Sequence, residues 1–202
     1  MSRLSFGETK SCCHIAYDGL KGERYRFWDG SIWEVIDAWA TSLSGFKALA
    51  IRPQAMPGRV VLAFAGTDSI RDVIADGAQV VGILPIQYPQ ALGVTNRCRR
   101  LYPSLQLCGN SLGGGLAAYS SVQTRLDAST INPAPLVAGA GLSALFGSNQ
   151  QIVNYIAGGS EVVSSSPGRN PGRDVAVPGS GNFFTRHMLA NTDPSVALPV
   201  QA

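Results

Sequence analysis

Apolar residues of this chain gather into short runs that glycine, proline and polar residues separate. Residues 60–64 form an uninterrupted apolar run, with proline and glycine shortly before it and glycine shortly after it. Such a run predicts a strand covered on both faces, as in a parallel sheet between two layers of helices. Residues 105–108 and 151–157 predict two further strands.

Around these runs the pattern predicts further elements. Aromatic and polar residues alternate over residues 22–33 around an Asp29–Gly30 turn signal, which predicts a short hairpin. Residues 136–146 predict either a buried helix or a lid that contacts an acyl chain. We also expect strands or edge strands at 32–39 and 46–51, and a strand running into a loop at 130–135. A helical stretch is expected at about 87–102, broken by Pro89. A long loop at 164–180 and a last ordered element at 183–187 should follow.

Strands that alternate with helices predict an α/β fold, a three-layer domain with a mostly parallel central sheet. The 202 residues, 45% of them hydrophobic, suit one domain over residues 1–202, with loose termini at 1–20 and 192–202. In such sheets functional side chains gather beyond the carboxyl ends of the strands. Thr67, Ser111, Asn132 and Glu161 all follow predicted strands.

Charge and composition narrow the classes of partner. The formal net charge is +3, and the arginines are scattered, so we expect no nucleic-acid surface. Arg97, Arg99 and Arg100 are expected on the polar face of a helix. The first fifteen residues contain no apolar run, and no stretch is long enough to span a bilayer, so the chain is expected to be cytoplasmic as synthesised.

The four cysteines give no sign of a metal site. Neither a C-x-x-C pair nor a Cys/His spacing of the kind that binds metal is present. Cys12 and Cys13 are adjacent and could pair only with strain, while Cys98 and Cys108 lie where a thiol usually acts as a small buried hydrophobe. A disulfide between distant cysteines stays open.

The clearest chemical signal is the pattern G-x-S-x-G over residues 109–113. It stands between a predicted strand and a helix of small residues, which is the context of a nucleophile elbow. Ser111 would occupy the tip of this sharp turn, where the chain passes so close to itself that side chains at Gly109 and Gly113 would clash. The alternative is a glycine-rich β-to-α turn without chemistry.

A serine nucleophile needs a base, and the base needs an acid. Of the two histidines, His187 follows the last predicted strand and a long loop, where the base of an α/β-hydrolase arrives, whereas His14 lies in the amino-terminal region. Glu161 directly follows a predicted strand and is the first candidate for the acid, and Asp174 is the second. Asp127 closes the elbow helix and is expected to point away.

The oxyanion formed by attack on an ester needs preset donors. The backbone N–H of Leu112, directly after the nucleophile, is expected to be one donor. Thr67, in the loop after residues 60–64, offers a second N–H and a hydroxyl.

These motifs carry a family resemblance. Residues 61–68, 107–117 and 132–135 resemble the successive signature blocks of the class 3 (fungal-type) lipases of the α/β-hydrolase superfamily. The resemblance covers roughly residues 59–190 and implies esterase or lipase chemistry without a cofactor. It implies Ser111 as nucleophile, His187 as base, and Thr67 with Leu112 as oxyanion hole. Three residues depart from the family pattern: Ala65 replaces its usual arginine, Asn110 its usual histidine and Glu161 its usual aspartate.

The leading hypothesis is a serine carboxylester hydrolase that cleaves a lipid or another small acyl ester through an acyl-enzyme on Ser111. Its partners would be that substrate and, peripherally, a membrane surface. Small lipase-like chains without a visible leader resemble antibacterial phospholipase effectors that a secretion machine delivers. Two alternatives stay open: a catalytically silent hydrolase-fold binding protein, and an acyltransferase that uses the same residues.

Overall fold

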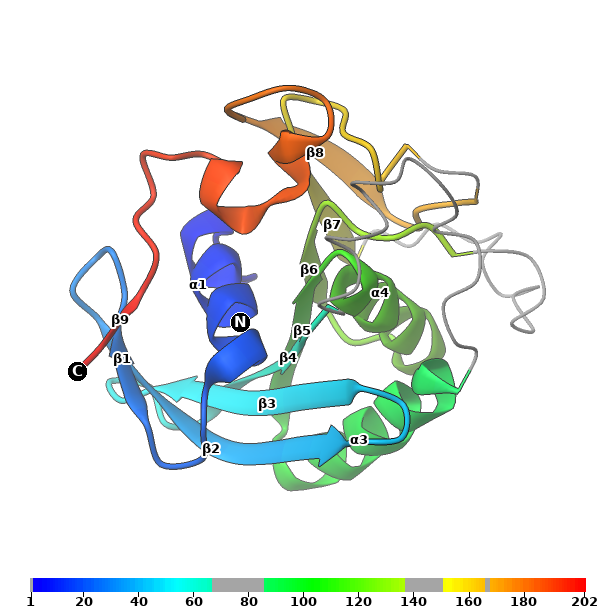
Figure 1. Ribbon diagram of the computed structural model, residues 1–202. Coiled ribbons are helices and arrows are strands. Elements are labelled where there is room, and N and C mark those ends of the chain that lie inside the picture. The colour runs from blue at the N-terminus through cyan, green and yellow to red at the C-terminus, as the bar shows by residue number, and fades with distance from the viewer. Residues whose placement is uncertain (1, 67–85, 137–150, 166–167) are drawn as a thin grey trace.

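One continuous sheet organises the computed structural model of this protein (Figure 1). The structure describes residues 2–66, 86–136, 151–165 and 168–202. Within these ranges, nine strands follow the spatial order β8-β7-β6-β5-β4-β3-β2-β1-β9. Thr67, expected as an oxyanion donor, and nearly all of segment 136–146 lie outside the described residues.

The sheet divides into a parallel half and an antiparallel half. Strands β4 to β8 pair in parallel, whereas β1 to β4 and the carboxyl-terminal strand β9 pair antiparallel. The expected parallel sheet is therefore confirmed for β4 to β8, and the predicted hairpin appears as the β1–β2 pair. The strands are β1 (Arg24–Arg26), β2 (Ile32–Thr41), β3 (Phe46–Pro53), β4 (Arg59–Phe64), β5 (Ser104–Asn110), β6 (Ala128–Ile131), β7 (Ile152–Ala157), β8 (Arg173–Val177) and β9 (Val200–Gln201).

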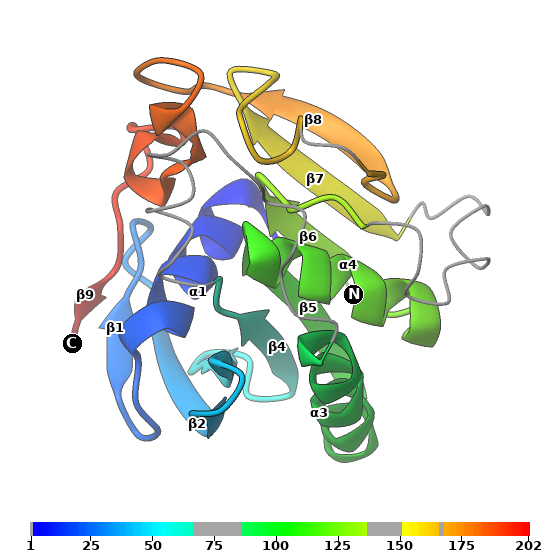
Figure 2. The same cartoon turned by 45° about the vertical axis from the view of Figure 1, so that its right-hand side comes forward.

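Helices cover both faces of the sheet and complete the expected three layers (Figures 1 and 2). Helix α1 (Phe6–Asp18) packs on one face, and helices α3 (Gln87–Leu101) and α4 (Leu112–Thr124) pack on the other. Two short 3-10 turns, η3 (Thr185–His187) and η4 (Leu189–Asn191), lie beside α1. None of the helices in the described ranges combines the length and apolar composition needed to cross a bilayer.

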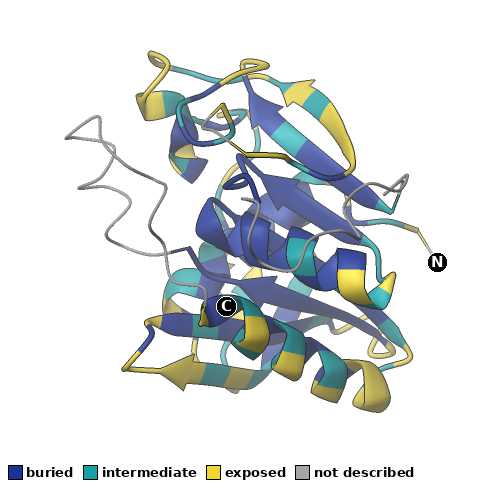
Figure 3. Cartoon of the chain, turned by 90° about the vertical axis from the view of Figure 1, so that its right-hand side faces the viewer, coloured by how far each residue is buried: buried dark blue, intermediate teal, exposed yellow. Residues whose placement is uncertain are grey.

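Alternating side chains of β4 feed two separate cores, as the continuous apolar run predicts. Val60, Leu62 and Phe64 face the α3 and α4 layer, whereas Val61 and Ala63 face α1. All six residues of the strand are buried. Figure 3 shows the central strands buried, while α3 exposes its outer side to solvent. The central strands therefore anchor the functional edge rigidly, because they are packed on both faces.

The expectation of a loose amino terminus is wrong, because residues 6–18 form the buried helix α1. Ser5 begins the helix with a capping box: its hydroxyl accepts from the N–H of Glu8, and the Glu8 carboxylate accepts from the N–H of Ser5. Small side chains such as Cys12 and Cys13 let the helix approach the sheet closely. All four cysteines are buried free thiols.

The carboxyl terminus is also held in place, contrary to the expected loose tail at 192–202. Lys10 on α1 is buried, and its Nζ donates to the carbonyl oxygens of Asp193 at 3.0 Å and Val196 at 2.7 Å. Strand β9 then pairs with β1 at the edge of the sheet. A composition typical of a loose terminus is thus ordered by contacts with the distant amino-terminal part of the chain.

Two further expectations need correction. Pro89 does not break the helix, because it is the third residue of α3 and lies in the first turn, where backbone N–H groups have no acceptor within the helix. The predicted loop at 164–180 contains strand β8. This strand pairs with β7 and exposes Arg173, Asp174 and Ala176, so an edge position explains its loop-like composition.

Candidate active site

Ser111 occupies a strained turn between β5 and α4. Its φ of 59° and ψ of −127° lie in a region that residues with a side chain rarely adopt. A Cβ at Gly113 would lie 2.1 Å from the carbonyl oxygen of Phe64, and one at Gly109 would lie 2.1 Å from the carbonyl oxygen of Gly113. The predicted close approach of the chain at both glycines is therefore confirmed.

Hydrogen bonds to the end of β6 hold this turn. The N–H of Ser111 donates to the carbonyl of Ile131 at 3.1 Å, and the carbonyl of Ser111 accepts from the N–H of Ala134 at 2.9 Å. The same Ile131 carbonyl accepts from Nδ2 of Asn110 at 3.1 Å. The elbow is thus fixed to the neighbouring parallel strand by backbone and side-chain contacts.

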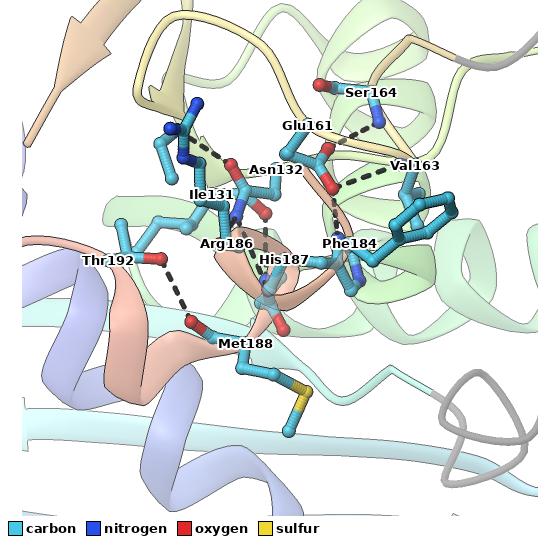
Figure 4. A network of polar contacts seen from close by, with 12 residues as sticks. Ile131, Asn132, Glu161, Val163, Ser164, Phe184, Arg186, His187, Met188 and Thr192 are labelled. Atoms are coloured by element: carbon cyan, nitrogen blue, oxygen red, sulfur yellow. Dashed lines mark hydrogen bonds and ion pairs between the residues drawn. The ribbon is translucent and has the colours of Figure 1, made fainter. Parts of the chain in front are cut away.

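His187 and Glu161 form a buried pair, seen in Figure 4. Nδ1 of His187 lies 2.7 Å from Oε2 of Glu161, and the two residues are 3% and 0% exposed. The Glu161 carboxylate also accepts from the backbone N–H groups of Val163, at 2.9 Å, and Ser164. With the carboxylate facing Nδ1, the proton of the neutral ring belongs on Nδ1, which leaves Nε2 as the basic nitrogen.

Burial and hydrogen bonding act in opposite directions on the Glu161 carboxyl. Burial raises its pKa, but the hydrogen bond and charge of His187, with the hydrogen bonds of Ser164 and Val163, outweigh that effect. The pKa of Glu161 is therefore lowered from its ordinary value of 4.5, and the side chain is a carboxylate at neutral pH.

Two buried polar atoms stand out at this edge of the sheet. Among the described residues, Oγ of Ser111 and Nε2 of His187 have no hydrogen-bond partner. Other buried side-chain atoms of the described residues lack a partner too, so these two matter because they belong to the serine of the elbow and to the histidine held by Glu161. In active sites without substrate the bond between nucleophile and base is often long, and it tightens when substrate binds.

Asn132 joins the end of β6 to the turn that carries His187 (Figure 4). Its Nδ2 donates to the carbonyl oxygens of Arg186 at 3.0 Å and His187 at 3.3 Å. Its Oδ1 accepts from the N–H of Ala157, at the end of β7, at 2.9 Å. The sequence placed Asn132 at a strand end and in a signature block, but gave it no role, because its partners lie far along the chain.

Tyr17 of α1 is a residue that the motifs did not indicate. Its hydroxyl donates to Oδ1 of Asn110 at 3.0 Å. A Cβ at Gly66 would lie 2.6 Å from that hydroxyl and 3.5 Å from Cβ of Ser111. Tyr17 therefore lies where α1, the loop after β4 and the elbow meet.

The remaining candidates fall in different places. Asp174 is exposed on β8, and its carboxylate accepts from Nδ2 of Asn154 at 2.9 Å, within the strands and not at the histidine. Asp127 directly precedes β6 and pairs with Arg3. It therefore lies at the amino-terminal ends of the parallel strands, opposite the ends that carry Ser111 and His187. His14 lies on α1.

Of the two expected oxyanion donors, Leu112 is the first residue of α4, so its N–H is one of those left free by the helix. Thr67 lies outside the described residues.

Comparisons with solved structures agree with this architecture. The lipase–propeptide complex of Rhizomucor miehei superposes with a TM-score of 0.58 at 18% identity, covering 84% of this chain and 64% of that one. A triacylglycerol lipase from Penicillium expansum superposes with a TM-score of 0.54 at 13% identity, covering 96% of this chain and 80% of that one. The fold is that of the lipase α/β-hydrolases.

Comparisons of sequence point to phospholipases. The chain is 40% identical over 75 residues to the extracellular phospholipase A1 of Serratia liquefaciens. That match covers 37% of this chain and 24% of the relative, so the chain spans about a quarter of the curated protein it resembles. The Tle-like phospholipase domain matches residues 29–151, which include the elbow and more than half of the chain. The chain belongs to the Tle-like phospholipase domain family.

Proposed function

We propose that this chain is a serine carboxylester hydrolase with Ser111 as nucleophile, His187 as general base and Glu161 as the acid that orients it. The observation that carries the proposal is the buried contact between Glu161 and Nδ1 of His187, which directs the other ring nitrogen away from the carboxylate. The strained elbow of Ser111, on a strand next but one to the strand that leads to Glu161, supports it.

The chemistry follows from these positions. Oγ of Ser111 attacks the ester carbonyl while Nε2 of His187 takes the hydroxyl proton. The Glu161 carboxylate stabilises the resulting imidazolium, and the N–H of Leu112, with Thr67 as the second proposed donor, stabilises the oxyanion. The alcohol leaves with the proton from His187, and water then attacks the acyl-enzyme by the same route, releasing the acid and restoring Ser111.

Phospholipids are the substrate class that we propose. Support comes from the family to which the chain belongs and from its relative in Serratia liquefaciens, which is described as a phospholipase A1. The same relative is described as extracellular, which supports export of this chain after synthesis in the cytoplasm.

We further propose that the site works in peripheral contact with a lipid surface. Phe183 and Phe184 are 41% and 45% exposed, although phenylalanine usually lies inside a protein. Their rings meet edge to face at 5.6 Å, only a few residues before His187. An apolar tip beside the base would enter the acyl region of a bilayer while the substrate ester reaches Ser111.

The test is product analysis on defined substrates. Phospholipid vesicles, triacylglycerol emulsions and short-chain soluble esters are each incubated with the wild-type protein and with Ser111→Ala. We expect free fatty acid and lysophospholipid from the vesicles with the wild type only. Acyl transfer to an added alcohol with little free acid would identify an acyltransferase. No turnover on any ester by folded wild-type protein would contradict the proposal in favour of a binding scaffold.

A further inference from the structure

The separation of Ser111 and His187 is set by neither residue alone. The described residues show no hydrogen bond between Oγ of Ser111 and Nε2 of His187. Ser111 lies between β5 and α4, whereas His187 lies in η3, near the end of the chain. Something between them must hold the two atoms at a reactive distance, because general base catalysis requires near hydrogen-bond contact.

The end of β6 is attached to both residues. The carbonyl of Ile131 accepts the N–H of Ser111, and the side chain of the next residue, Asn132, donates to the carbonyls of Arg186 and His187. One peptide unit therefore separates the anchor of the nucleophile from the anchor of the base. Figure 4 shows Asn132 between the end of β6 and the backbone of the histidine turn.

Asn132 uses its entire side-chain amide in this bridge. Both bonds from Nδ2 hold the histidine turn, and Oδ1 holds the end of β7 through the N–H of Ala157. The residue is fully buried, with a φ of 45°, a left-handed conformation that asparagine tolerates better than most residues. Buried amides of this kind are rigid, since each broken bond leaves an unsatisfied group.

We propose that Asn132 is a positioning residue that fixes the distance between Oγ of Ser111 and Nε2 of His187. This inference rests on the proposed function, because it assigns Asn132 a task in that same reaction. The side-chain hydrogen bonds of Asn132 go to backbone groups, and not to Oγ of Ser111 or Nε2 of His187. Asn132 acts by holding the backbone of His187, while Glu161 sets the orientation of the ring from the other side.

The chain offers a matched control in Asn154. This residue is also fully buried, on neighbouring β7, and its Oδ1 accepts from the hydroxyl of Thr130 at 2.8 Å. Its Nδ2 donates to the Pro171 carbonyl and the Asp174 carboxylate. Both asparagines therefore stabilise the sheet, but only Asn132 is bonded to the His187 turn. A variant of Asn154 therefore shows how far removing a buried amide affects the protein when the His187 turn is left intact.

Asn132→Asp is the main variant, because it keeps the shape and the acceptor for Ala157 while removing both donors. Asn132→Gly is the second; it keeps the left-handed backbone and removes the whole side chain. Asn154→Asp is the control. Thermal unfolding gives the folded fraction of each protein, and the rate at which a fluorophosphonate labels Ser111 is measured per folded molecule, with Ser111→Ala as blank.

We expect Asn132→Asp and Asn132→Gly to label about 10²-fold more slowly than wild type, as misplaced catalytic groups do. On a soluble ester kcat should fall with KM nearly unchanged. The downfield proton resonance of the His187 Nδ1–H should shift or broaden in both variants and persist in Asn154→Asp, which should label at the wild-type rate.

Equal slowing by Asn132→Asp and Asn154→Asp, or wild-type labelling in both Asn132 variants, would overturn the inference and leave the proposed function intact. A wild-type protein that is folded but not labelled at Ser111 would overturn the proposed function, and this inference with it. Where Asn132→Asp does not fold, Asn132→Gly gives the same comparison.

Discussion

Nδ1 of His187 lies 2.7 Å from Oε2 of Glu161, and both side chains are removed from solvent. Glutamate at this place departs from the aspartate that the resemblance to fungal-type lipases implies. Its carboxylate is nevertheless held by two backbone N–H groups and by the histidine. The longer side chain therefore satisfies the requirement for a fixed, ionised partner at the imidazole.

The choice of acid can be tested by comparing two variants. Glu161→Gln should lower kcat by about 10³-fold or more, because an amide no longer fixes the imidazole tautomer or stabilises its protonated form. Asp174→Asn should leave kcat nearly unchanged, since Asp174 is exposed and bonded to Asn154. Steady-state kinetics on a soluble ester gives both values. A larger loss in Asp174→Asn than in Glu161→Gln would refute the assignment.

The lowered pKa of Glu161 makes a second prediction, with a defined sign. Because the folded pKa lies below the ordinary 4.5, the group contributes stability above pH 4.5 and loses it as pH falls through the folded value. The difference in unfolding free energy between wild type and Glu161→Gln should therefore be largest near neutral pH and shrink below pH 4.5. Urea unfolding at several pH values measures it, and a difference that grows on acidification would contradict it.

Gly113 should tolerate no side chain. Gly113→Ala would place Cβ 2.1 Å from the Phe64 carbonyl, so we expect a destabilisation of about 1–3 kcal/mol together with loss of esterase activity. Gly93→Ala is the control, because Gly93 lies within α3 with open space around it, and alanine there should stabilise by about 0.5–1 kcal/mol. Thermal unfolding and esterase assays distinguish the two. An active, stable Gly113→Ala would show that the elbow is not as tight as described.

The exposed phenylalanines predict a dependence on the physical state of the substrate. Replacing Phe183 and Phe184 together by serine should lower activity on phospholipid vesicles at least about tenfold, since each buried ring contributes about 1.5–3 kcal/mol. Activity on a soluble short-chain ester should change little. Leu101→Ser is the control, because Leu101 is 57% exposed but lies far from the proposed site. It ends α3 just before β5 begins, at the end of the parallel strands opposite to Ser111. Equal losses on both substrates would argue against contact with the lipid surface.

Features fixed by neighbouring residues could be predicted from the sequence. The elbow is one, because a Cβ at Gly109 would clash with the carbonyl of Gly113 within the same short turn. The buried strand β4 is another, since its apolar run is complete in itself. The end of β7 was also recognisable, and Glu161 follows it closely.

Features that depend on distant parts of the chain could not be predicted from the sequence. Lys10 marks α1 as polar, yet it is buried because carbonyls more than 180 residues away accept its ammonium group. The capping box at Ser5 and Glu8 is a local signal for that helix, which the expectation of a loose terminus overlooked. Strand β8 has a loop-like composition because it lies at the edge of the sheet, where its side chains are exposed. Asn132 bonds with residues 54 and 55 positions away, a separation that no local pattern contains.

The most direct test of the account is the site at which an active-site probe attaches. The folded wild-type protein is treated with a fluorophosphonate, and the peptide that contains Ser111 is sequenced by mass spectrometry. Ser120 and Ser121, on the same helix, serve as internal controls, because both are buried serines without the strained elbow. We expect one adduct, on Ser111, which does not form in Ser111→Ala and forms more slowly in His187→Ala. An adduct on another residue, or none at all, would contradict it.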